Sequence, residues 1–172
     1  MIRHILHSYA VAINAACTEF GGRVYIENEG GQYPKSGGGV TTLKQMTRPF
    51  CVVRDGGSVK SPDEVGGSQR KYKDDCTIIA MVHCKSENIG TARNREQYQV
   101  LDLPDKVSRA CLAEINVVDM DSGATLTTAA PFGNISTGRI EDGGTREIVQ
   151  FARAITFQIE VRRETGATTV NN

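Results

Sequence analysis

The stretch Val149–Arg163, VQFARAITFQIEVRR, decides the fold of this chain. Its odd-numbered positions are apolar except at Arg153, whereas its even-numbered positions are small or polar. Side chains on a strand alternate between the two faces of a sheet, so this pattern predicts one strand with a buried face and a polar face. The strand would be two to three times the usual length of about 5–6 residues. Such a strand predicts a sheet whose polar face is available for a second use.

Composition places the chain among globular proteins. At 172 residues it is long enough for a real core, and residues 1–163 are expected to form a single domain. Its 20 basic and 20 acidic residues balance, which gives no support to sequence-specific nucleic-acid binding or to a membrane role. The first residues are not typical of a signal peptide, because His4, His7 and Ser8 interrupt the apolar run. No stretch approaches the ~20 apolar residues of a membrane span.

Two amphipathic helices are predicted. In the first, apolar residues recur at three- and four-residue spacing from Ile2 to Phe20, and Gly21-Gly22 would end the helix. The second would begin at Asp102–Asp105 (DLPD), because proline and acidic residues suit a first helical turn. Its core stripe would run from Val107 to Val118, and residues 87–98 fit either a loop or the leading part of this helix.

Further strands are predicted at residues 23–29, 50–53, 76–84 and 134–141. Residues 76–84 are apolar on both faces, which is typical of a central strand. A turn at Asp142–Thr145 would join the last of these strands to 149–163 as an antiparallel hairpin. The expected fold class is therefore α+β: an antiparallel sheet with two helices packed on one face and a long C-terminal β-hairpin. The residues expected in one core are Leu6, Ile13, Ile78, Val82, Cys111, Ile155, Phe157 and Ile159.

Two long loops are predicted at residues 30–48 and 56–74, which are rich in glycine and show no apolar periodicity. Residues 119–132 are predicted as a shorter loop, and residues 164–172 as a flexible tail. Long loops are unusual in a compact domain unless they serve a function. Ordering about 40 residues without a core would cost tens of kcal/mol, so a neighbouring molecule is expected to hold the two long loops.

The sequence predicts no catalytic, cofactor-binding or metal-binding residue. Five cysteines lie in apolar patterns without C-x-x-C spacing, as buried free thiols of a reducing cytoplasm do: Cys17, Cys51, Cys76, Cys84 and Cys111. His83 with Cys84 or Cys111 could imitate a nucleophile pair, but no local pattern activates either thiol. His4 and His7 are three residues apart on the first helix and lack further metal ligands nearby.

The order of elements resembles a known family. The amphipathic N-terminal helix leads to an apolar strand with a charged end, Arg48–Asp55 (RPFCVVRD). A central strand at 75–84 follows, then the helix opened by DLPD and a terminal hairpin that ends in 151–163. This layout resembles the tail terminator (tail completion) proteins of long-tailed bacteriophages and the related minor neck and tail proteins. The resemblance covers most of residues 1–163 and includes no short diagnostic motif.

The resemblance implies a structural virion protein, assembled in the host cytoplasm, with no catalytic residues to assign. Such proteins form a ring of six subunits that caps the tail tube, stops its polymerisation and docks to the head-side connector. The implied partners are therefore further copies of the chain, the tail tube protein and the head-side connector protein. A head-to-tail contact makes a ring when its rotation closes.

Six basic residues are candidate subunit contacts: Arg54, Lys60, Arg70, Lys71, Lys73 and Arg153. Charged contacts of this kind set register and encounter more than affinity. Two alternatives remain open at this point. A small cytoplasmic thiol-dependent enzyme would need one unusually reactive cysteine, and a monomeric ligand-binding module would need a pocket between the sheet and the loops.

Overall fold

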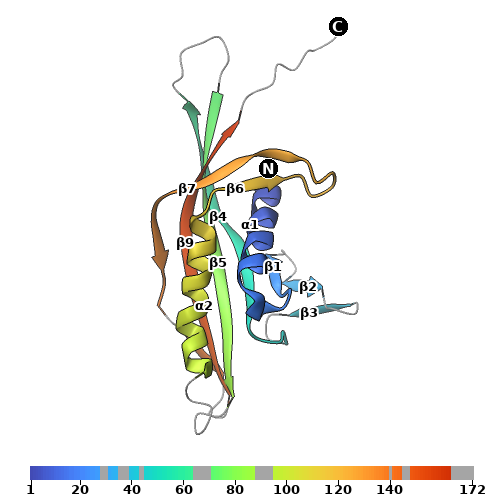
Figure 1. Ribbon diagram of the computed structural model, residues 1–172, viewed down its shortest axis with the longest axis vertical. Coiled ribbons are helices and arrows are strands. Elements are labelled where there is room, and N and C mark those ends of the chain that lie inside the picture. The colour runs from blue at the N-terminus through green and yellow to red at the C-terminus, as the bar shows by residue number, and fades with distance from the viewer. Residues whose placement is uncertain are drawn as a thin grey trace.

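A computed structural model describes residues 1–27, 31–34, 39–42, 45–63, 71–87, 95–139, 141–144 and 148–163. Over these residues the protein is α+β, as predicted, with two α-helices and a strongly twisted sheet (Figure 1). The helices are α1 (Ile2–Ala16) and α2 (Arg95–Leu112), with a 3₁₀ turn at Thr18–Phe20 after α1. The strands are β1 (Val24–Ile26), β2 (Gln32–Pro34), β3 (Val40–Thr42), β4 (Phe50–Asp63), β5 (Lys71–Glu87), β6 (Ile115–Val118), β7 (Thr125–Thr137), β8 (Glu141–Gly144) and β9 (Ile148–Arg163).

The main sheet has the order β1-β4-β5-β9-β7-β6, with β8 paired to β9 beside this path, and β2 and β3 form a separate two-stranded sheet. The prediction of an antiparallel sheet is wrong in one place, since β1 runs parallel to β4. The physical reason is the connection between β1 and β4, which contains the antiparallel pair β2–β3. Because the chain returns through this pair before β4 begins, β4 runs in the same direction as β1. All other described pairings are antiparallel.

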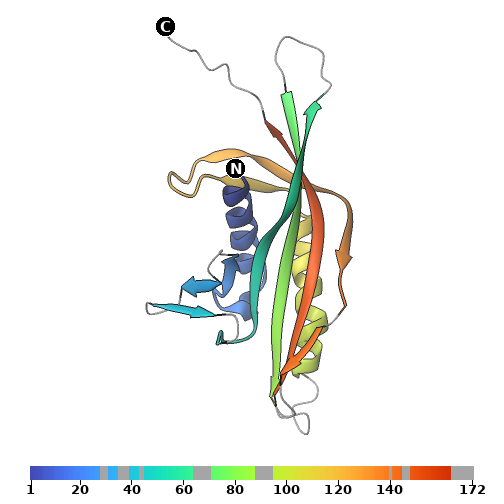
Figure 2. The same ribbon diagram turned by 180° about the vertical axis from the view of Figure 1, so that it is seen from behind.

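The long strand and the central strand are both confirmed. β9 covers Ile148–Arg163, and β5 lies between β4 and β9, paired with β9 from Tyr72 to Glu87. The alternation along β9 is also as predicted, because Phe157 is buried and its neighbour Gln158 is exposed. Figure 2 shows β4, β5 and β9 side by side from the side opposite to Figure 1.

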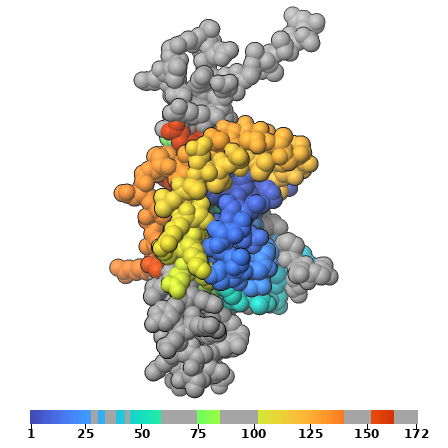
Figure 3. Space-filling model, viewed as in Figure 1, coloured from blue at the N-terminus to red at the C-terminus, as the bar shows by residue number. Residues whose placement is uncertain are grey.

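One apolar core contains all eight residues predicted to be buried together. It joins residues of both helices to alternate residues of β4, β5 and β9, such as Cys51, Ile78 and Phe157. The ring of Phe157 lies edge-on to that of Tyr9 of α1, with centroids 5.1 Å apart. Figure 3 shows α1 and α2 side by side at the surface. A second, smaller cluster uses the intervening residues of β4, where Phe50 and Val52 pack with Tyr33 and Met46.

The predicted loop at 56–74 is wrong, because β4 continues to Asp63 and β5 already begins at Lys71. Gly56 and Gly57, at the start of the predicted loop, lie in a β-bulge, where the register shifts between Asp55 and Ser58. Gly57 has φ +104, and its N–H donates to Asp55 Oδ1 at 2.8 Å. The predicted loop at 30–48 contains β2 and β3. Residues 64–70 and the tail at 164–172 lie outside the described residues.

The region after α2 also differs from the prediction. Helix α2 begins at Arg95, before the predicted start at Asp102, so Pro104 lies inside the helix. The helix ends at Leu112, so the apolar stripe predicted for one helix from Val107 to Val118 is divided between α2 and strand β6. The predicted loop at 119–132 is largely β7, whose Thr- and Ala-rich residues are held by pairing with β9 and β6. The predicted strand at 134–141 is divided between β7 and β8. Residues 142–144, predicted as a turn, pair with β9 instead.

Candidate functional site

The far end of β4 and β5 gathers three of the six predicted contact residues. We call Ser58–Asp63 of β4 with Lys71–Cys76 of β5 the distal ribbon. Lys60 lies opposite Asp74, Lys73 opposite Ser61, and Lys71 opposite Asp63. Figure 1 shows this end of the two strands continuing past β6 and β7. Two of these three lysines are therefore at register positions opposite an aspartate, a placement that favours pairing of two strands. Arg70 lies outside the described residues.

The other two predicted contacts lie elsewhere. Arg54 precedes the bulge, and its Nε lies 3.2 Å from Glu27 Oε1. Arg153 donates from Nε to the carbonyl oxygen of Gly138 at 3.0 Å. It is nine positions along β9 from Arg162, which lies opposite Lys73, and this spacing corresponds to about 30 Å of strand. The structure therefore brings the three lysines together and leaves Arg153 far from them.

The β6 edge of the sheet is covered by α1. The buried hydroxyl of Ser8 accepts a hydrogen bond from the Val118 N–H at 3.0 Å and donates one to the His4 carbonyl oxygen at 2.8 Å. His4 Nδ1 accepts a hydrogen bond from the Met120 N–H at 3.1 Å. These bonds fasten the helix to the strand edge. The sequence carried no signal for this role, because the hydroxyl and the imidazole find their partners more than 100 residues away.

The β1 edge, at the opposite end of the sheet, is different. The Cys51 N–H donates to the Arg23 carbonyl oxygen at 3.0 Å, and the Glu27 N–H donates to the Val53 carbonyl oxygen at 2.9 Å. Backbone groups of successive residues in a strand point to opposite sides, so those of Val24 and Ile26 point away from β4. No other described strand pairs with β1. The outer edge of β1 is therefore open within the described part of the chain.

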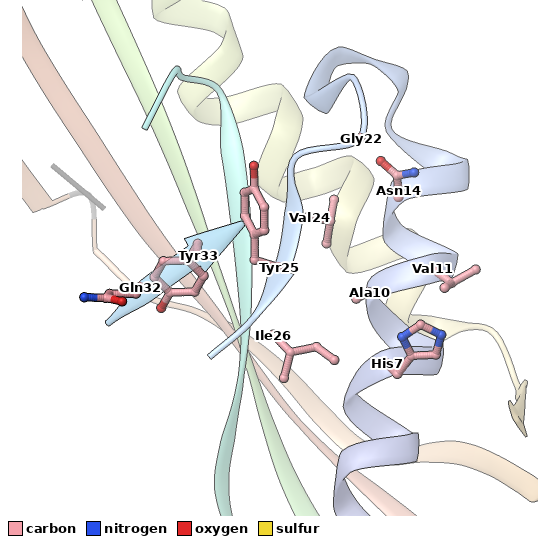
Figure 4. Close-up of a pocket in the computed structure, with 10 residues that line it drawn as sticks. All are labelled: His7, Ala10, Val11, Asn14, Gly22, Val24, Tyr25, Ile26, Gln32 and Tyr33. Carbon is pink, nitrogen blue, oxygen red and sulfur yellow. The ribbon is translucent and has the colours of Figure 1, made fainter. Parts of the chain in front are cut away.

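A groove of about 350 Å³ lies along this open edge, between α1, β1 and β2 (Figure 4). We call it the α1–β1 groove. Its walls are mainly apolar, and Val11 of α1 is 53% exposed there. The lining residues are His7, Ala10, Val11, Asn14, Gly22, Val24, Tyr25, Ile26, Gln32 and Tyr33. The groove was not predicted from the sequence, because β2 lies within residues 30–48, which were predicted to be a loop.

On the second face of the sheet, His83 lies near two arginines, Arg48 and Arg54. The imidazole stacks on Phe50, with centroids 4.4 Å apart and an interplanar angle of 14°, and the Arg48 guanidinium lies 5.4 Å from the centre of the same Phe50 ring. Burial, together with the positive charges of Arg48 and Arg54, lowers the pKa of His83 to about 4. His83 and Cys84 are successive residues of β5 and point to opposite faces, so this histidine is badly placed to activate that thiol.

All five cysteines are buried thiols outside any disulfide, as predicted. Burial raises the pKa of Cys84 and Cys111 to about 12 and that of Cys17 to about 11. The pKa of Cys51 is raised in the same direction for the same reason. A thiol with so high a pKa stays protonated near neutral pH, and the protonated form is a poor nucleophile.

The described residues contain no group of three or more His, Cys, Asp or Glu side chains arranged to hold a metal ion. Among the same residues, neither helix has the length and apolar character needed to cross a membrane.

Comparisons with known proteins do not place the chain in a family. No family model matches it, and no curated protein matches it. Twelve chains of solved structures match it in three-dimensional comparison. One of them is 13% identical, aligns over 95% of this chain and 99% of its own, and has a TM-score of 0.41. Similarity at that level supports no argument about fold or function.

Proposed function

We propose that the protein is a structural component of a phage virion: a ring-forming tail terminator that caps the tail tube and joins it to the head-side connector. The distal ribbon is the observation that carries this proposal. β1 covers only Cys51–Val53 of β4, and no described strand covers the outer edge of β4 beyond them. Uncovered strand edges invite pairing with another chain, and a ring supplies a neighbouring chain at every subunit.

The proposal includes the finer architecture expected from the resemblance, with both helices on one face of the sheet and a long C-terminal hairpin. The shared core of α1, α2 and alternate residues of β4, β5 and β9 supports the first feature. Antiparallel pairing from Glu141 with Ala152 to Gly144 with Val149 supports the second. In this arrangement the edge of the distal ribbon meets the neighbouring subunit, and the second face of the sheet is left for contacts with the tail tube protein and the connector protein.

The state of the thiols supports a structural role over the thiol-dependent enzyme. All five are buried, and burial raises the pKa of the four named above. A catalytic cysteine needs the opposite, a partly exposed thiol with a lowered pKa. The thiols thus favour a structural role, and the proposal is of a protein without enzymatic activity, cofactor or membrane contact that is assembled in the host cytoplasm and acts in the virion.

The α1–β1 groove favours the monomeric ligand-binding module as a second candidate. Its volume of about 350 Å³ lies in the range of ~300–1,000 Å³ typical of small-molecule sites. The two candidates differ in oligomeric state, because the terminator forms a ring of several copies whereas the alternative is a monomeric ligand-binding module. A ligand that raises the unfolding temperature of a monomeric protein would favour the second candidate.

Deletion of the gene in the encoding phage tests the proposal. A terminator stops polymerisation of the tail tube, so particles made without it should carry tails of abnormal length that are not joined to heads. Electron microscopy measures both features, and expression of the wild-type chain in trans should restore them. Tails of normal length, joined to heads, in the deletion strain would contradict the proposal.

A further inference from the structure

The two ends of the main sheet are treated differently. At the β6 end, the Val118 and Met120 N–H groups donate to side chains of α1, and the edge is closed at those positions. At the β1 end, no hydrogen bond from another described residue reaches the outward backbone groups of Val24 and Ile26. Proteins usually cover or blunt such edges. The open edge therefore lies where a partner can reach it.

The backbone of β1 specifies the shape of that partner. Val24 and Ile26 each offer one N–H donor and one C=O acceptor along the same edge, repeated at about 6.6 Å. An extended peptide presents complementary groups with the same repeat, which is the basis of recognition by strand addition.

The walls of the α1–β1 groove specify the side chains that fit beside this edge. Ala10 and Val11 of α1 form one wall, and Tyr33 of β2 contributes to the other (Figure 4). Neither lysine nor arginine nor any acidic residue is among the lining residues. The groove therefore accepts an extended segment with a small apolar or uncharged residue turned toward α1.

The chain itself carries a second open edge that is unlike the first. The outer edge of β4 is paired at Cys51–Val53 and open from Ser58 to Asp63 among the described residues. Because Pro62 has no N–H, the part of this edge that offers both donors and acceptors is Ser58–Ser61. Joining an edge of one copy to a different edge of the next is a heterologous contact, and such contacts close into rings or extend into filaments. An isologous contact between two β1 edges would instead stop at a dimer.

We propose that the α1–β1 groove binds the Ser58–Ser61 edge of β4 from a second copy of this chain, which adds a strand to β1 and places the small residues Val59 and Ser61 on the side toward α1. The sheets of neighbouring subunits then continue into one another around the assembly. This inference rests on the proposed ring and names the contact that builds it.

A matched pair of helix-surface variants tests the groove. Val11 is 53% exposed in the groove, and Leu112 is 58% exposed at the end of α2, outside it. Val11→Lys would place an unpaired charge in the contact and should weaken assembly by roughly a hundredfold. Leu112→Lys should leave it within about twofold of wild type, a change too small to reflect a lost contact. Light scattering over a dilution series measures assembly, and circular dichroism confirms that both variants fold.

Cross-linking tests the occupant. A Val11→Cys, Ser61→Cys double variant places one thiol in the groove and one on the distal ribbon, while the native thiols are buried. A short bismaleimide should then link successive copies into a ladder that ends at the ring number. Each single variant should give no ladder, and neither should a Leu112→Cys, Ser61→Cys control.

The outcomes separate this inference from the proposed function. A wild-type ring that tolerates Val11→Lys, or one that gives no ladder with the double variant, overturns the inference and leaves the ring proposal standing. A wild-type chain that remains monomeric at hundreds of micromolar, where even a contact of micromolar strength is populated, overturns both.

Discussion

Phe157→Ala measures how much the long strand contributes to the core. The Phe157 side chain is 1% exposed and packs against α1, where its ring meets Tyr9 edge-on at 5.1 Å. Truncating a buried phenylalanine to alanine removes apolar burial and leaves a cavity, at a cost of about 3–5 kcal/mol. The lost aromatic pair, worth ~0.5–1.5 kcal/mol, places the expected value in the upper part of that range. For a chain of this size the unfolding midpoint should fall by roughly 6–20 °C.

The assay is urea and thermal unfolding followed by circular dichroism, at one fixed protein concentration because assembly shifts apparent stability. Gln158→Ala is the matched control, since Gln158 is the next residue of β9 and is exposed on the opposite face. It should change stability by no more than about 0.5 kcal/mol. Equal effects from the two substitutions, or a larger effect from Gln158→Ala, would refute the assignment of faces to β9.

Four further predictions concern other parts of the fold. Ser8→Ala leaves the Val118 N–H without its acceptor and should cost about 1–3 kcal/mol in urea unfolding. Gly56→Ala would place a Cβ 2.8 Å from Thr77 Cγ2 and should lower the free energy of unfolding by about 1–3 kcal/mol. Adding Thr77→Ser, which removes Cγ2, should recover part of that loss. No recovery in the double variant would argue against the close approach. The pKa of His83 is lowered to about 4 in the folded state, whereas an unfolded histidine binds a proton below pH ~6.5. Between these two pH values the unfolded state binds more protons, so the free energy of unfolding should fall from pH ~6.5 toward 4. His83→Phe should lessen this loss. The five native thiols should react slowly with a thiol reagent at pH 8 and rapidly in denaturant. One thiol that reacts rapidly in the folded protein would favour the thiol-dependent enzyme instead.

The sequence was sufficient where apolar periodicity is strong. The alternation along Val149–Arg163 correctly placed β9 and its buried face, and the apolar run at 76–84 identified β5 as central. The helical stripe from Ile2 located α1, although a 3₁₀ turn replaces its predicted last turn before Gly21. In each case burial alone determines which residues face inward, so a local pattern carries the information.

The sequence failed where pairing, and not burial, holds the strand. Residues 58–63 (SVKSPD) show no apolar alternation, and they become strand because β5 lies beside them. Gly56 and Gly57 were predicted to begin a loop, but they form a bulge that lets β4 continue. The α1–β1 groove was missed for a related reason, since it depends on which edge of the sheet is left open and no local pattern records that.

The mass of the purified wild-type chain in solution tests the central claim most directly. The chain has a mass of 18.7 kDa, so a ring of six copies should scatter light as a particle of about 112 kDa. The account predicts that value, unchanged on moderate dilution, and a closed ring by electron microscopy. A particle that stays at 18.7 kDa across the concentration range would contradict the ring, and with it the proposed contact at β1.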